Sequence, residues 1–248
     1  MSKKLVIMIS GWAHSKDAMA PLSTFLARDC YVKAVSLIDL LSTGRKQAGG
    51  NSSPYALGLK ELVNRCRVPP AIIGWSMGAI VALEACIKEQ LNVGRIVGIA
   101  ATARFCAAEG YPFGLDSQVV RAVKMGLSKK AADIMRGFLG DVASPYQLPD
   151  DLMEKQIASS LSMGIETLSH GLQYLNDTDL RGSLGSLKIP LLVINGRRDR
   201  IVPWQAGEFL SNNVPRGAFI PDDESGHNLV LTNPNGLASH IRKFLKAP

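Results

Sequence analysis

The chain has 248 residues, a length that fits either one large α/β domain or two small ones. Hydrophobic residues make up 46% and charged residues 20% of the chain, and this apolar content excludes a mainly disordered protein. The formal net charge is +7, but lysine and arginine are spread thinly and no basic run reaches five, so no nucleic acid is expected as a partner. No stretch approaches the roughly 18 apolar residues of a membrane span, so no membrane is expected either.

The amino-terminal segment carries two lysines followed by the apolar run 5–9. A secretory signal needs an apolar core of roughly 7–15 residues, whereas Ser10 and Gly11 interrupt this run. The run is expected to be a buried strand, and the protein is expected to be cytoplasmic. The cysteines are scattered singly, without the spacing of metal ligands, and are expected to be free thiols: Cys30, Cys66, Cys86 and Cys106. No metal site is expected.

Short apolar segments alternate with amphipathic segments along the chain. The apolar segments predict strands at residues 5–9, 32–38, 71–73, 95–100, 190–194 and 217–220. The amphipathic segments predict helices at residues 18–28, 54–67 and 78–90. This alternation is typical of a mostly parallel sheet with helices on both faces.

The alternation stops between about residues 105 and 178, where helical periodicity dominates. Helices are expected at residues 117–125, 128–139 and 150–160, with glycine and proline between them, for example Gly126 and Gly140. A helical stretch between two strand–helix units predicts a lid over the sheet. We therefore expect a core of residues 1–104 and 179–248 and a helical lid of residues 105–178.

The strongest chemical signal is the segment Gly74-Trp75-Ser76-Met77-Gly78, which matches G-x-S-x-G between a predicted strand and a predicted helix. A serine on such a sharp turn stands clear of the sheet, and the first amides of the helix face any negative charge beside it. Ser76 is therefore the candidate nucleophile.

Serine needs a histidine base, itself oriented by a carboxylate. His227 follows the last predicted strand, in a loop where parallel sheets place their sites. Asp199 follows the preceding strand, and the order Ser76, Asp199, His227 is typical of α/β-hydrolase triads. Solvated loop charges better explain the rival acids close to His227, which are Asp222, Asp223 and Glu224.

The other histidines have other expected roles. His240 lies in the closing helix and is expected on the surface, and His170 is expected to be a structural or rim residue of the lid. His14 follows the first strand and is a candidate for the cavity entrance.

The negative oxygen formed during ester attack needs preorganised donors. These are expected to be the backbone amides of Met77 and Trp12, and Gly11 allows close approach of the backbone.

The whole chain resembles the α/β-hydrolase superfamily and, more narrowly, the pimeloyl-[acyl-carrier protein] methyl ester esterases of biotin synthesis. The resemblance rests on Gly11-Trp12, on the G-x-S-x-G segment, on residues 99–105 and 178–181 at the two lid borders, on Phe138-Leu139 within the lid, and on residues 199–203. Two segments depart from the family pattern. Ser10-Gly11 stands where members usually carry His-Gly, and Asp39 is followed by Leu40 instead of the usual D-x-P-G-x-G-x-S loop.

The resemblance implies a serine ester hydrolase that acts on a methyl ester of a pimeloyl chain, with no metal or organic cofactor. Trp12, Trp75 and Phe138 would line an apolar groove for the acyl chain; ordinary core packing is the alternative. The lid would present basic residues to an acidic acyl-carrier protein. Residues 119–138 contain a single acid, Asp133, against five cations: Arg121, Lys124, Lys129, Lys130 and Arg136. This excess of positive charge fits a docking surface, and a solvated helix face explains it as well.

Three other functions remain open from the sequence. A broad short-chain carboxylesterase has the same triad, and so does a hydrolase of carbon–carbon bonds. A non-catalytic ligand sensor on the same fold is the alternative from a different class. Dehalogenases and epoxide hydrolases are disfavoured because those relatives carry aspartate where Ser76 stands.

Overall fold

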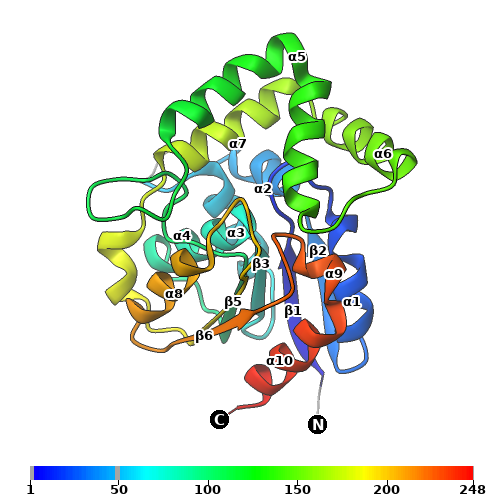
Figure 1. Ribbon diagram of the computed structural model, residues 1–248. Coiled ribbons are helices and arrows are strands. Elements are labelled where there is room, and N and C mark those ends of the chain that lie inside the picture. Colours follow the sequence, from blue (N-terminus) through cyan, green and yellow to red (C-terminus); the bar gives the residue numbers. More distant parts are fainter. Residues whose placement is uncertain (1–2, 48–50, 248) are drawn as a thin grey trace.

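The computed structural model describes residues 3–47 and 51–247, and a six-stranded parallel sheet forms its centre (Figure 1). The strands lie in the order β2-β1-β3-β4-β5-β6. Their bounds are β1 (Lys4–Ile9), β2 (Cys30–Val35), β3 (Ala71–Trp75), β4 (Arg95–Ile99), β5 (Leu191–Gly196) and β6 (Gly217–Asp222). The order places β3, which leads to Ser76, between β1 and β4. The predicted α/β-hydrolase fold is confirmed.

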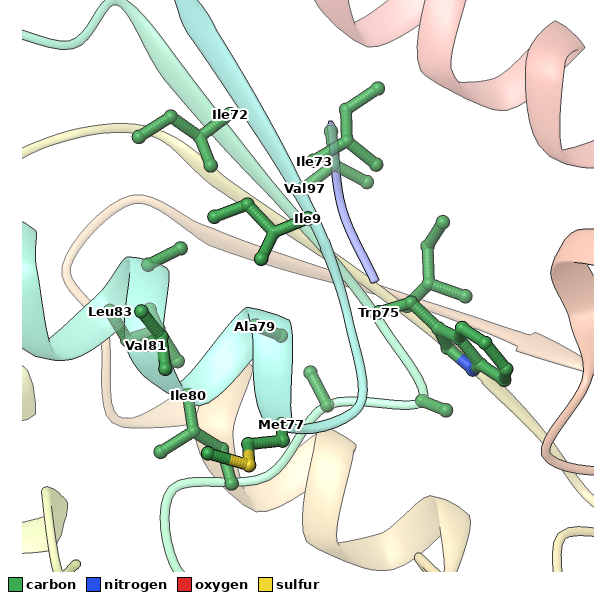
Figure 2. Packing of buried hydrophobic residues seen from close by; sticks show 14 of the residues in the cluster. Ile9, Ile72, Ile73, Trp75, Met77, Ala79, Ile80, Val81, Leu83 and Val97 are labelled. Carbon is green, nitrogen blue, oxygen red and sulfur yellow. The ribbon is translucent and has the colours of Figure 1, made fainter. Parts of the chain in front are cut away.

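Helices cover both faces of the sheet. They are η1 (Lys16–Met19), α1 (Ala20–Leu26), α2 (Leu37–Gly44), α3 (Pro54–Asn64), α4 (Met77–Lys88), α5 (Ser117–Ala143), α6 (Asp150–Leu161), α7 (Ile165–Asp177), η2 (Arg181–Ser186), α8 (Trp204–Asn212), α9 (Leu229–Thr232) and α10 (Pro234–Lys246). Helices α1 and α10 pack together, as do α3 and α4 (Figure 1). Side chains such as Ile72, Ile73 and Val97 fill the core between sheet and helices (Figure 2).

The second strand ends earlier than its apolar pattern predicts, so the expected strand 32–38 is wrong at its carboxyl end. Strand β2 stops at Val35, and Ser36 begins helix α2. The Ser36 side chain accepts a hydrogen bond from the Asp39 amide, while the Asp39 carboxylate accepts from the Ser36 amide at 2.9 Å. This reciprocal capping satisfies two amides at the start of the helix. Helix α2 thus stands where the family pattern has a glycine-rich loop.

The segment 105–178, here called the helical insertion, connects β4 to β5 and carries α5, α6 and α7. Figure 1 shows these helices beyond the carboxyl ends of the strands. The two helices expected at 117–125 and 128–139 are one element, α5, with a kink at Lys130, where φ is −140° and ψ is 45°. Gly126 does not break the helix. A Cβ atom there would lie 2.5 Å from Ile134 Cδ1, so glycine lets the two arms of α5 pack closely.

The two ends of the helical insertion meet beside Asp179. Arg104 and Asp179 form an isolated antiparallel bridge, and Arg104 Nη1 lies 2.6 Å from Asp179 Oδ2. Arg181 Nη2 donates to the same oxygen at 2.8 Å. Hydrogen bonds from Arg181, with a further one from Arg104, lower the pKa of Asp179 to about 2. These contacts join segments that are 75 residues apart and fix where the insertion leaves the core.

A buried carboxylate also ties the helical insertion to the core. Glu84 of α4 is 2% exposed and accepts hydrogen bonds from Tyr174 of α7 at 2.9 Å and from the Ser53 hydroxyl at 2.6 Å. Lys88 donates to it at 3.0 Å, so the buried charge is paired.

Within the described ranges, no helix combines the length and the hydropathy that a membrane span requires.

Candidate active site

Ser76 occupies the turn between β3 and α4, as the sequence predicts. Figure 2 shows the strand running directly into the helix, with Trp75 at the end of one and Met77 at the start of the other. Ser76 has φ 55° and ψ −123°, a conformation that residues with a Cβ rarely adopt. Such strain persists only where the surroundings impose it, and it is concentrated at functional sites.

The glycines on either side of Ser76 leave no space for a side chain. A Cβ atom on Gly74 would lie 2.4 Å from Ala79 Cα, and one on Gly78 would lie 2.6 Å from the Ile9 carbonyl oxygen. Backbone atoms cannot move aside as the end of a flexible side chain can. The close packing of β1, β3 and α4 therefore requires the two glycines of the motif.

His227 and Asp199 form a buried pair. His227 Nδ1 lies 2.8 Å from Asp199 Oδ2, and the side chains are 2% and 0% exposed. The other oxygen, Asp199 Oδ1, accepts hydrogen bonds from the amides of Ile201 at 2.8 Å and Val202 at 2.9 Å. A carboxylate in this position orients the neutral imidazole with its proton on Nδ1 and leaves Nε2 free to accept one.

The rival acids have other partners. Asp222 accepts hydrogen bonds from the Ser225 amide at 2.9 Å and the Asn233 side chain at 2.7 Å. Asp223 pairs with Arg197, and Glu224 pairs with Arg198, both at 2.7 Å. These contacts leave Asp199 as the acid beside His227, in agreement with the chain order of the three candidate residues.

The loop of His227 is attached directly to the turn of Ser76. The Trp75 indole N–H donates to the His227 carbonyl at 2.9 Å, and the two rings lie 5.9 Å apart between centroids. On the other side, a Cβ atom on Gly11 would lie 3.3 Å from Ser76 Cβ, so the loop after β1 approaches the serine closely. Residues from three distant parts of the chain, around positions 11, 76 and 227, thus meet at the carboxyl edge of the sheet.

Ser76 opens into a cavity of about 360 Å³ between the core and the helical insertion. Trp12 and Phe138 line it, with their rings edge to face at 4.7 Å. Trp75 is not among the residues that line this cavity; it lines a neighbouring one of about 280 Å³. Most other lining residues are apolar: Phe105, Leu115, Val119, Val120, Val123, Ile134, Leu172, Leu175 and Ile201. The cavity has the size and character of a small-ligand site.

Charged residues at this cavity were not expected from the sequence. Arg200, Asp133 and Asp141 line it together with the apolar side chains. Arg200 directly follows Asp199, so its place after the fifth strand is the one sequence signal that points to it. Asp133 and Asp141 lie on α5 among exposed charges, and their sequence pattern is that of a solvated helix face.

Trp12 lies against helix α7, where Gly171 makes room for it. A Cβ atom on Gly171 would lie 2.5 Å from Trp12 Cδ1 and 2.8 Å from Trp12 Nε1. Alanine usually stabilises a helix interior relative to glycine by about 1 kcal/mol. Here we expect Gly171→Ala to lower the free energy of unfolding by about 1–3 kcal/mol, the usual effect of overpacking. Gly140→Ala on α5, where nothing lies within 4 Å, is the matched control and should not destabilise. Urea unfolding of both variants measures the difference, and equal effects would contradict it.

The remaining histidines are not part of the His227–Asp199 pair. His170 Nδ1 lies 3.0 Å from the Tyr55 hydroxyl, and His240 is exposed. His14 lines the neighbouring cavity with Trp75, and its ring packs against the Trp75 ring at 4.6 Å. Burial is the main cause that lowers the pKa of His14 from 6.5 to about 4; the hydrogen bond to the Trp12 carbonyl opposes it and the nearby His227 adds to it, so His14 is neutral at pH 7.

The depressed pKa of His14 predicts an acid-sensitive fold. Between pH 6.5 and 4 the unfolded chain binds more protons at this position than the folded chain, so stability falls as the pH falls. The shift corresponds to a loss of about 2–3 kcal/mol over that range. His14→Asn should flatten this part of the pH–stability curve, whereas His240→Asn should leave it unchanged. A curve for His14→Asn that keeps the wild-type slope would exclude His14 as the cause.

The five basic residues proposed for docking have different surroundings. Arg121 and Lys124 border a surface hollow between α5 and α7, together with Gln173 and Asp177. Lys129 and Lys130 are exposed at the kink of α5. Arg136 forms an ion pair with Glu154 of α6, so its charge is compensated. Glu154 therefore makes Arg136 less free to meet a partner, and Lys124 also has a polar contact, because its Nζ donates to Gln173 Oε1.

The fold and this site define an α/β hydrolase. The chain matches the Alpha/beta hydrolase family over residues 6–240, and it belongs to that family. Among curated relatives, it is 28% identical over 246 residues to the pimeloyl-[acyl-carrier protein] methyl ester esterase of Stenotrophomonas maltophilia (strain K279a), covering 98% of this chain and 93% of that protein.

Solved structures agree with the fold. An esterase from Exiguobacterium antarcticum superposes with a TM-score of 0.85 at 19% identity, over 99% of this chain and 93% of the other. A hydrolase from Oleispira antarctica superposes with a TM-score of 0.87 at 16% identity, over 100% and 93% of the two chains.

Proposed function

We propose that the protein is a serine ester hydrolase with Ser76 as nucleophile, His227 as base and Asp199 as the orienting acid. The observation that carries the proposal is the buried His227–Asp199 hydrogen bond, in a loop attached to the strained turn of Ser76. The cavity beside Ser76 supplies an apolar site for the acyl chain. Curated relatives named as esterases support this choice of chemistry.

In the proposed reaction, His227 Nε2 takes the proton of the Ser76 hydroxyl while the oxygen attacks the ester carbonyl. The backbone amides of Trp12 and Met77 hold the negative oxygen; each such donor contributes roughly 3–4 kcal/mol. His227 then gives its proton to the leaving alcohol, and the acyl group remains on Ser76. A water molecule then loses a proton to His227 and attacks the acyl-enzyme. His227 returns this proton to Ser76 Oγ as the bond to the acyl group breaks, which releases the acid and restores the free serine.

The substrate that we propose is the methyl ester of a pimeloyl chain on acyl-carrier protein, so that methanol is the leaving alcohol. The names of the relatives and the apolar lining beside Trp12 and Phe138 support it. The helical insertion acts as the lid over this chain. Arg121, Lys124, Lys129 and Lys130 attract the acidic carrier protein by long-range electrostatics, with Arg136 in a lesser role because of Glu154.

Kinetics on two substrates test this proposal. Neutralising Arg121 and Lys124 to glutamine should lower kcat/KM for the carrier-bound ester about tenfold or more at low salt, and leave a free methyl ester unaffected. Lys33→Gln on β2, an exposed cation of the core, is the control. If the docking variants keep wild-type rates on the carrier-bound ester, the docking surface is wrong. Complementation of a biotin-requiring strain that lacks its own esterase tests the substrate.

A further inference from the structure

The loop that carries the Trp12 amide is a tight turn in a disfavoured conformation. The His14 amide donates to the Gly11 carbonyl at 3.3 Å, which closes a four-residue β-turn. Ala13, at the third position of this turn, has φ 59°. Turns with a positive φ at that position favour glycine or asparagine, because a Cβ atom is strained there. Something other than the intrinsic preference of Ala13 must therefore hold the turn.

The direction of the Trp12 amide depends on this turn. The Gly11 carbonyl and the Trp12 N–H belong to the same planar peptide group and point in opposite directions. The hydrogen bond that fixes the Gly11 carbonyl consequently fixes where the Trp12 N–H points. In the described part of the chain, no protein group accepts a hydrogen bond from this amide, so it is available to a ligand at Ser76.

All four carbonyls of the turn accept a hydrogen bond, and one of the donors comes from far away. The Gly11 carbonyl accepts from the His14 amide, and the Trp12 carbonyl accepts from the His14 ring at 2.8 Å. The His14 carbonyl accepts from the Ser10 hydroxyl at 2.9 Å. The carbonyl of Ala13 accepts from the Ser160 hydroxyl at 2.7 Å. Ser160 is 2% exposed and lies on α6 of the helical insertion, 147 residues along the chain.

We propose that Ser160 is a positioning residue of the reaction: by binding the Ala13 carbonyl, helix α6 holds the turn that aims the Trp12 amide at the ester oxygen. This inference rests on the proposed function, since it gives the Trp12 amide its role. The insertion then completes the site as well as covering it. Helix α7 adds a second tie, because the Trp12 indole donates to the Leu168 carbonyl at 2.9 Å.

The position of Ser160 predicts which kinetic constant depends on it. Ser160 does not line the cavity of Ser76 but the neighbouring one. Its loss should therefore leave substrate binding intact and weaken only the contact to the developing oxyanion, which lowers kcat at constant KM. A purely structural role is the competing explanation, because the same hydroxyl lies 2.9 Å from the Gln156 carbonyl of its own helix.

The test compares Ser160→Ala with Ser162→Ala, using a free methyl ester as substrate. Ser162 is exposed, and within the described residues its hydroxyl donates to the Ser159 carbonyl alone, so it controls for loss of a serine hydroxyl at this end of α6. Ser160→Ala should lower kcat about tenfold and change KM less than twofold. A trifluoromethyl ketone, which binds as an oxyanion, should lose affinity by the same tenfold factor. Ser162→Ala should behave as wild type.

A second substitution separates positioning from stability. Glycine accepts the positive φ of position 13 without strain, so Ala13→Gly should restore part of the kcat lost in Ser160→Ala. A folded Ser160→Ala enzyme with wild-type kcat would overturn the inference, and so would a loss that Ala13→Gly leaves unchanged. If Ser160→Ala does not fold, Ser160→Thr, which keeps the donor, takes its place and must retain kcat. Turnover that survives Ser76→Ala would instead refute the proposed function itself.

Discussion

Replacing Ser76 with alanine is expected to abolish both ester turnover and covalent labelling by a fluorophosphonate probe. Alanine removes the attacking oxygen, and no other hydroxyl is expected to stand on so strained a turn beside the apolar cavity. Loss of a catalytic serine lowers kcat by roughly 10⁶ in another triad enzyme. The measurement is the rate of hydrolysis of a free methyl ester, with in-gel fluorescence for the label.

Ser211→Ala is the matched control for this experiment. Ser211 is also buried, at 3% exposure, but its hydroxyl donates a hydrogen bond to the Glu208 carbonyl of its own helix, α8. The control should keep labelling and turnover. Labelling that persists in Ser76→Ala would place the nucleophile elsewhere, and absence of labelling in the wild-type protein would favour a ligand sensor on this fold.

Replacing Asp199 with asparagine should lower kcat by roughly 10⁴, the size of the tautomer effect in another triad enzyme. The asparagine oxygen still accepts hydrogen bonds from the amides of Ile201 and Val202, so the loop should keep its shape. Its NH₂ group, however, would face His227 Nδ1 and favour the tautomer with the proton on Nε2. Such an imidazole cannot accept the Ser76 proton.

Asp223→Asn tests the specificity of this effect. Asp223 lies four residues from His227 but forms an exposed ion pair with Arg197, so its change should leave kcat within about twofold of wild type. Near-normal turnover in Asp199→Asn, or a large loss in Asp223→Asn, would mean that a different acid orients His227.

The sheet and the residues at its carboxyl edge could be predicted from local patterns. Buried parallel strands are short, apolar runs, and a G-x-S-x-G segment between such a run and a helix has few other structural solutions. The pairing of His227 with Asp199 follows from the same logic, because both residues come directly after strands of one sheet. Local sequence is sufficient where an element's position in the fold determines its chemistry.

Other features depend on contacts between distant segments. The sequence suggests a helix break at Gly126, but α5 is broken four residues later, at Lys130. A Cβ atom on Gly126 would lie 2.5 Å from Ile134 Cδ1, which is a contact across the break that the local pattern does not show. The end of β2 depends on one capping serine, Ser36. Ser36 lies within the apolar run 32–38, and the pattern of this run predicts a longer strand. The contact of Ser160 with Ala13 leaves no trace in either local sequence.

The most direct test of the account is to identify the residue that carries the acyl group during turnover. After rapid acid quenching of the reaction with a slowly hydrolysed ester, mass spectrometry of the digested protein should find the acyl adduct on the peptide that contains Ser76. The adduct should accumulate in Asp199→Asn only as slowly as that variant turns over. An adduct on another residue, or steady turnover with no adduct at any quench time, would contradict a covalent mechanism at Ser76.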